Sequence, residues 1–137
     1  MNDSSVRVHL DLSFEEAQIV SEAMELIARI QMGQLDKIEN EFTSSPRIEI
    51  GSARFDNVRA KLEELSNVSG LQNLGILHKD VPEHARIAWD MHQVVRRVLA
   101  YHRQPEGGLE THFDPPMLTS KRSSASAFIA GESKDEK

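Results

Sequence analysis

Apolar residues recur every three or four positions over three long stretches of the 137-residue chain, namely residues 14–32, 52–66 and 80–103. That interval is the period of one face of an α-helix, so each stretch predicts a helix. A shorter stretch with the same spacing, residues 34–42, predicts a small additional helix. Three to four helices are therefore expected.

Polar residues at the ends of these stretches predict where the helices begin and end. Ser13 and Glu16 have the spacing of a capping box, in which each side chain accepts a hydrogen bond from a free backbone N–H of the first turn. Gly33 is expected to end this first helix. Asp80 is expected to cap the last helix, with Pro82 in its first turn.

Residues 6–12 follow a different pattern, in which apolar and polar side chains alternate strictly. This alternation predicts a half-buried strand. Residues 47–50 also alternate, which fits either a short strand pairing with the first or the approach to a helix. The fold class predicted is α+β, predominantly helical, with one or two short strands, three to four helices and an extended C-terminal tail.

Composition divides the chain into a single compact domain, residues 1–103, and a tail, residues 104–137, rich in proline, glycine and serine. The tail is too poor in apolar residues for a core of its own, so we expect it to pack partly on the domain or on a second subunit. Together with the broad apolar face of the last helix, this favours a homo-oligomer. The apolar anchors of the tail are Phe113, Met117, Leu118, Phe128 and Ile129.

Charge is distributed unevenly along a chain whose net charge is −6. Residues 1–85 carry 8 Lys and Arg against 15 Asp and Glu, whereas residues 86–103 alone carry four arginines against one aspartate. General nucleic-acid binding is not expected of an acidic protein, and a local cationic patch suits a small anion or an acidic partner. No segment is apolar enough to span a membrane, so a soluble, cytoplasmic protein is expected.

The last helix carries the candidate binding residues along one edge of its apolar face. Successive residues turn by 100°, which places the four within about 60° of one another. Arginine offers a planar fork for phosphate or carboxylate, and tryptophan offers a face for stacking. The same residues would also serve as a structural rim covering the core. The candidate ligand-binding residues are Trp89, His92, Arg96 and Arg103.

No other residue pattern has the spacing of a catalytic or metal-binding motif. The chain lacks cysteine and the familiar nucleophile and phosphate-loop motifs, so an enzyme is not favoured and no cofactor is expected. The six histidines do not recur at helical spacing, which leaves His78, Asp80 and His84 as a weak cluster and predicts no metal site. The glycine pair in residues 105–108 fits an anion-binding loop or a simple turn.

Several phrases of the sequence resemble a group of small phage-encoded proteins mostly described as hypothetical. They are residues 28–35, 85–96, 105–108 and the pair Phe113-Asp114. A pattern like YD-x-x-QVIR recurs in that group, and its polar positions correspond to Asp90, Gln93 and Arg96, with Trp89 where tyrosine is usual.

The resemblance implies a phage accessory protein that counters a host defence system in the host cytoplasm. The function expected is non-catalytic binding and sequestration of a small anionic, nucleotide-like signalling ligand. The alternative is a protein–protein inhibitor or regulator that acts on a host defence protein through an oligomeric helical surface, without a small ligand.

Overall fold

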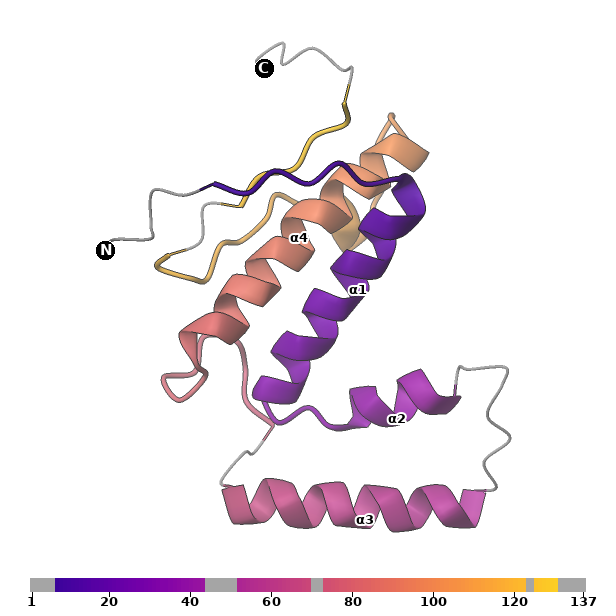
Figure 1. Cartoon of the computed structure of the whole chain (residues 1–137), viewed down its shortest axis with the longest axis vertical. Coiled ribbons are helices and arrows are strands. Elements are labelled where there is room, and N and C mark those ends of the chain that lie inside the picture. The colour runs from indigo at the N-terminus through magenta and orange to yellow at the C-terminus, as the bar shows by residue number, and fades with distance from the viewer. Residues whose placement is uncertain (1–6, 44–51, 70–72, 123–124, 131–137) are drawn as a thin grey trace.

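The computed structural model describes residues 7–43, 52–69, 73–122 and 125–130, and this part of the chain is predominantly helical, with no β-strand. The predicted helices are confirmed, with small differences in their ends (Figure 1). The elements are α1 (Phe14–Gln31), α2 (Asp36–Thr43), α3 (Ser52–Ser69), α4 (Glu83–Arg103) and the short 3-10 helix η2 (Thr111–Phe113).

Both ends of α1 form as the sequence predicts. The Ser13 hydroxyl accepts a hydrogen bond from the Glu16 N–H at 3.2 Å, and the Glu16 carboxylate accepts one from the Ser13 N–H at 2.7 Å. After the helix, Gly33 adopts a φ of 77°, a left-handed conformation that glycine tolerates at no steric cost. The chain then turns directly into α2.

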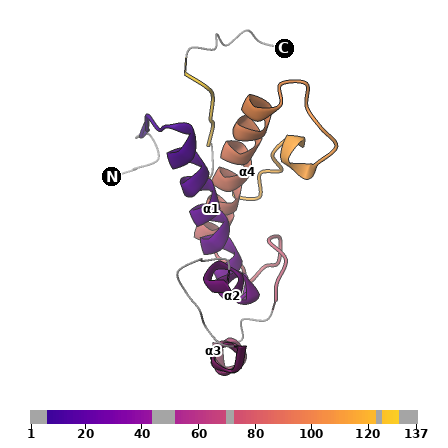
Figure 2. The same ribbon diagram turned by 90° about the vertical axis from the view of Figure 1, so that its right-hand side faces the viewer.

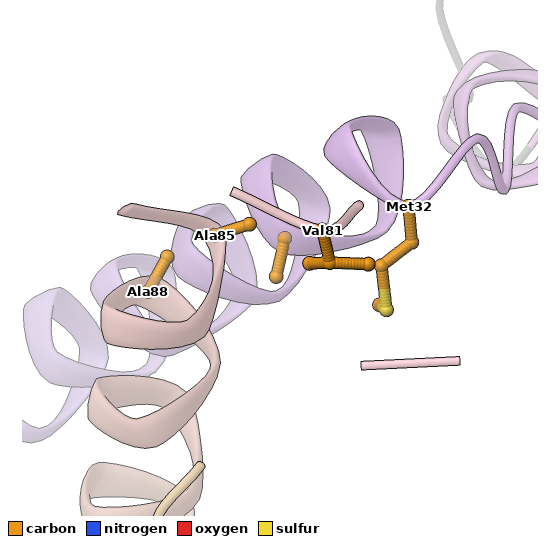
Figure 3. Close-up of a cluster of buried hydrophobic side chains, with 5 residues drawn as sticks. Met32, Val81, Ala85 and Ala88 are labelled. Carbon is orange, nitrogen blue, oxygen red and sulfur yellow. The ribbon is translucent and has the colours of Figure 1, made fainter. Parts of the chain in front are cut away.

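Two of the three long helices in the described residues, α1 and α4, form an antiparallel pair around a small core. At one end of the pair, alanine side chains let the helices approach closely, and Met32 and Val81 complete the cluster (Figure 3). Toward the other end, the two ribbons diverge (Figure 2). The buried hydrophobic cluster consists of Ala28, Met32, Val81, Ala85 and Ala88.

Helix α3 lies apart from this pair (Figure 1). Among the described residues it contacts α2 and no other helix. Its apolar stripe is largely exposed, with 46% of Val58 and 64% of Leu65 accessible to solvent. The narrow stripe that the sequence shows on this helix is therefore not buried within the described part of the chain.

Two local predictions are wrong. Residues 7–12 form no strand, and Val8 and Leu10 are 80% and 70% exposed. Alternation alone does not make a strand, because the backbone groups of a strand need a paired neighbour. The segment proposed as that neighbour, residues 47–50, lies outside the described residues.

The second correction concerns the start of α4, where the N-cap is Pro82 and not Asp80. Pro82 has φ −68° and ψ 151°, so the chain is still extended at this residue and becomes helical at Glu83. The preceding residues form a turn in which the Val81 N–H donates to the His78 carbonyl. Asp80 thus lies too early in the chain to cap the helix.

Beyond η2, the tail returns along α4, and residues 117–122, which we call the strap, bind polar side chains of that helix. The Gln93 side chain both donates to the Met117 carbonyl at 2.9 Å and accepts from its N–H at 3.1 Å. The fully buried Asp90 carboxylate accepts from the Thr119 N–H, the Thr119 hydroxyl and the Ser120 N–H at 2.7–2.9 Å.

Glu83 holds the far end of the strap. Its carboxylate accepts from the Ser120 hydroxyl at 2.7 Å, from the Lys121 N–H at 2.8 Å and from the Arg122 N–H at 3.2 Å. The hydrogen bond from the Ser120 hydroxyl, with the backbone bonds and the charge of Arg86, lowers the pKa of Glu83 against a smaller effect of burial. The strap is thus fixed by hydrogen bonds to carboxylates and an amide rather than by apolar packing.

Candidate functional site

A pocket of about 350 Å³ lies between α1, α4 and residues 110–113. It opens where α1 and α4 diverge. Helix α4 contributes the side chains of His92, Arg96 and Arg103, so three of the four candidate residues line a single pocket. The opposite wall comes from α1, and the third wall comes from the segment around η2.

Trp89, the fourth candidate, lies outside this pocket. It is half-buried against the hydrophobic cluster, and the Arg29 guanidinium lies 5.5 Å from the centre of its ring. Its ring is also 5.6 Å from that of His92. The indole is thus in contact with side chains of the protein, so this arrangement gives Trp89 a structural role and no stacking surface in the pocket.

His92 forms the floor of the pocket and connects α4 to α1. Its Nδ1 lies 3.0 Å from the Ser21 carbonyl oxygen and 3.1 Å from the Ser21 hydroxyl. A carbonyl oxygen only accepts hydrogen bonds, so Nδ1 carries the proton and Nε2 is left as an acceptor. That Nε2 is 4.0 Å from a Glu25 carboxylate oxygen, beyond hydrogen-bond distance.

The protonation states of His92 and Glu25 follow from their surroundings. Burial lowers the pKa of His92, and the charges of Arg96 and Arg29 lower it further, against the opposing effects of Ser21 and Glu25. Burial raises the pKa of Glu25, but the hydrogen bond from Arg29 at 2.7 Å, with the charges of His92, Arg29 and Lys37, lowers it overall. At neutral pH, a neutral imidazole therefore faces an ionised carboxylate.

The two arginines of the pocket use only part of their hydrogen-bonding capacity. Arg96 donates from Nη2 to the Thr111 carbonyl at 3.3 Å, and its buried Nε has no partner in the described residues. Arg103 donates to the Gln18 side chain at 2.7 Å, and its guanidinium lies 4.8 Å from the centre of the Phe14 ring. Each guanidinium has five N–H donors and lines the pocket.

Carboxylates also line the pocket, so its charge is mixed rather than cationic. Glu22 and Glu25 come from α1, and Glu110 comes from the segment before η2. Glu22 accepts from Gln18 at 3.0 Å, and a Glu110 oxygen is 3.1 Å from His112 Nδ1. A ligand in this pocket meets two arginines on one side and three carboxylates around them.

The serine, histidine and glutamate at the floor resemble a hydrolytic triad in composition but not in arrangement. In a triad, the imidazole takes a proton from the serine hydroxyl. Here the nitrogen nearest the Ser21 hydroxyl is the one that carries a proton for the Ser21 carbonyl. His92 cannot activate Ser21 in this arrangement, so these residues join the helices and line a binding pocket.

The glycine pair near the end of α4 shapes the third wall. Gly107 has a φ of 80° and its N–H donates to the Gln104 carbonyl, which makes this segment a turn. A Cβ on Gly108 would lie 2.6 Å from a carbon of the Phe113 ring. The ring of Phe113 packs edge-on against Tyr101 at 5.2 Å and lines the pocket. Because glycine has no Cβ, the Phe113 ring can pack directly against residue 108 and form the third wall of the pocket.

The three polar positions of the phage-protein pattern all bind the C-terminal segment of this chain. Asp90 and Gln93 hold the strap, and Arg96 donates to the Thr111 carbonyl. Their spacing of three residues places them on neighbouring parts of one helix surface. The pattern thus marks where the tail docks, and Arg96 alone of the three also lines the pocket.

Comparisons of the chain with protein-family models, with curated proteins and with solved structures find no match. In the part of the chain that the structure describes, no three His, Asp or Glu side chains are grouped so that they could hold a metal ion. No described helix is both long and apolar enough to cross a membrane. Arguments about function therefore rest on the pocket and the exposed surface.

Proposed function

We propose that the protein binds and sequesters a small anionic, nucleotide-like ligand in the pocket between α1 and α4, without catalysis. The observation that carries this proposal is the convergence of His92, Arg96 and Arg103 on one pocket of about 350 Å³. That volume lies within the range of small-molecule sites in proteins. The guanidinium groups of Arg96 and Arg103, each of which lines the pocket, supply the recognition of phosphate or carboxylate.

The biological role that we propose rests on the resemblance to phage-encoded proteins. A phage accessory protein that holds a nucleotide signal would lower its free concentration and thereby counter host signalling. Such a protein needs affinity and abundance but no catalytic group, which agrees with a histidine whose Nδ1 proton is directed to a backbone carbonyl.

The test is thermal unfolding of the full chain against a panel of mono-, di- and cyclic nucleotides. A ligand present at 100 times its dissociation constant adds about 2.7 kcal/mol to the free energy of unfolding. Arg96→Ala should abolish the shift in melting temperature. Arg97→Ala is the matched control, because Arg97 lies on the same helix but its guanidinium faces the Tyr101 ring at 5.5 Å, outside the pocket.

An absence of any shift across the panel would refute this proposal. A shift that survives Arg96→Ala would move the ligand to another part of the molecule. Sequestration further requires that the ligand be released chemically unchanged when the complex is denatured by heat, whereas recovery of a converted product would identify an enzyme.

A second candidate function is protein–protein inhibition through an oligomeric helical surface. It is favoured by the outer face of α1, where Ile19 and Ile27, eight residues apart, are 60% and 43% exposed. Residues at this spacing share one face of a helix. We propose a second copy of the chain as the occupant. Light scattering should then give twice the monomer mass, and Ile19→Lys with Ile27→Lys should restore the monomer mass.

A further inference from the structure

The floor of the pocket contains two hydrogen-bond acceptors that face each other with no donor between them. His92 Nε2 and a Glu25 carboxylate oxygen are 4.0 Å apart, and both residues line the pocket. Only 8% of the His92 side chain is exposed, and no described residue donates to its Nε2. A donor that enters the pocket at this point can reach both acceptors.

An unused donor lies next to these acceptors on the same helix. Arg96 follows His92 by four residues, which places it one turn further along α4, about 6 Å away. Its Nε is buried and has no hydrogen-bond partner among the described residues. No donor of the described residues therefore lies between His92 Nε2 and the Glu25 carboxylate, and one turn further along α4 the Arg96 Nε–H has no acceptor among them.

We infer that the ligand carries an amino or ammonium group together with its anionic group. The nitrogen donates to His92 Nε2 and to the Glu25 carboxylate, while the anionic group accepts from Arg96. This inference rests on the proposed function and adds an amino or ammonium group to the anionic ligand proposed there. It also explains the carboxylates of the pocket, since Glu22, Glu25 and Glu110 would repel a ligand that carries negative charge alone.

The protonation of the floor agrees with this assignment. Burial lowers the pKa of His92, so its ring is neutral near pH 7 and Nε2 accepts rather than donates. Glu25 remains ionised because Arg29 donates to it. A donor that enters between them completes two hydrogen bonds, one of which is to a charged group and is correspondingly stronger.

Two kinds of molecule supply this chemistry. In a nucleotide, the donor is the exocyclic amine of the base. In a small phosphorylated amine, the donor is an ammonium group. Both present an N–H donor and an anionic group within one molecule, and matched pairs that differ only in the amine distinguish them.

The experiment measures dissociation constants by calorimetry for the full chain with three matched pairs. The pairs are AMP with purine riboside 5′-monophosphate, CMP with 2-pyrimidinone riboside 5′-monophosphate, and phosphoethanolamine with ethyl phosphate. In at least one pair, the amine should bind about tenfold more tightly or better, as expected for a hydrogen bond to a charged group. The pair that shows this difference identifies the source of the amine.

His92→Asn tests the floor directly. Asparagine keeps an N–H near the position of Nδ1 for the Ser21 carbonyl but removes the Nε2 acceptor, so the preference for the amine should shrink. Glu25→Gln tests the same preference independently. It therefore replaces His92→Asn in the experiment if the asparagine variant does not fold. Arg97→Ala should leave the preference unchanged.

Equal affinity within every pair would overturn this inference and leave the proposed function intact. A preference that is unchanged in both Glu25→Gln and a folded His92→Asn would also overturn it, because the amine would then bind elsewhere. No binding by any of the six compounds would overturn the inference, whereas a thermal shift with a di- or cyclic nucleotide would still support the proposed function.

Discussion

His92 has two roles that depend on its two ring nitrogens. Through Nδ1 it holds α4 to the backbone of Ser21, and through Nε2 it faces the pocket beside Glu25. Only the second role requires a neutral ring, because Nδ1 donates to the Ser21 carbonyl in either protonation state. A second proton on the imidazole would occupy the acceptor that we assign to the ligand.

This dependence predicts how stability changes with pH. The pKa of His92 is lowered from an ordinary value near 6.5, so the unfolded chain takes up this proton first and stability falls as pH decreases below about 6.5. The pKa of Glu25 is lowered from about 4.5, so a further loss begins below that pH. The groups that face His92 are Glu25, Arg96 and Arg29.

Melting temperatures measured between pH 8 and pH 4 check this prediction. His92→Asn should remove the decline that begins near pH 6.5 and keep the one that begins near pH 4.5. An identical pH profile in both proteins would show that His92 does not titrate differently in the folded chain.

Sequence reasoning found part of the pocket because helical periodicity is a local property. A turn of 100° per residue was enough to place His92, Arg96 and Arg103 on one edge of α4. It could not identify Ser21, which lies 71 positions from His92 in the chain. The sequence did contain one signal for this side of the pocket. Residues 21 and 25 are polar although they lie on the face of α1 that packs against α4, where a purely apolar contact would have apolar residues.

At the scale of elements, α4 shows how one helix uses its surface for three purposes. Ala85 and Ala88 face the core cluster, His92 and Arg96 face the pocket, and Asp90 faces the strap. The buried Asp90 carboxylate is fully compensated, because it accepts three hydrogen bonds. Strap and helix are thus joined at two carboxylates, Asp90 and Glu83, and at the side-chain amide of Gln93.

Asp90→Ala should loosen the middle of the strap, at Thr119 and Ser120, while Gln93 and Glu83 still hold its two ends. The substitution removes a buried charged acceptor and leaves the N–H groups of Thr119 and Ser120 without partners, at a cost of about 3 kcal/mol in the free energy of unfolding. Urea unfolding measures the loss, and hydrogen exchange should show faster exchange at those two amides.

Thr119→Val is a second, less disruptive substitution at the same contact. It removes only the hydroxyl bond to Asp90 and should cost about 1 kcal/mol. Unchanged exchange at residues 119 and 120 in Asp90→Ala would mean that other contacts hold the strap.

Elements whose signals are local were predicted well. Ser13, Glu16 and Gly33 fix both ends of α1 through contacts within a few residues. The strand over residues 6–12 was wrong because pairing depends on a distant partner. The cap at Asp80 was wrong because the turn before Pro82 delays the start of α4.

At the scale of the whole molecule, stability is concentrated in the α1–α4 pair. Helix α3 packs only on α2 within the described residues, and Val58 and Leu65 stay largely exposed. Helices in proteins owe most of their stability to tertiary packing of an amphipathic face, and α3 has little of that packing among the described residues. The protein should therefore not unfold uniformly.

Hydrogen exchange at low protein concentration should reveal this difference. Amides of α3 should exchange at least about tenfold faster than those of α1 between Ser21 and Ala28, because local opening needs little loss of buried surface. Equal protection in both helices would contradict the prediction. Protection of α3 that rises with protein concentration would indicate that a second copy covers its stripe.

The close approach of α1 and α4 at one end determines how much room exists at the other. Alanines 28, 85 and 88 do not touch the pocket, yet they fix where the two helix axes meet and hence how far apart His92 and Ser21 can be held. The width of the pocket is thus set partly by side chains that do not line it. Variation at these three positions would change which molecules fit while every pocket residue stayed the same.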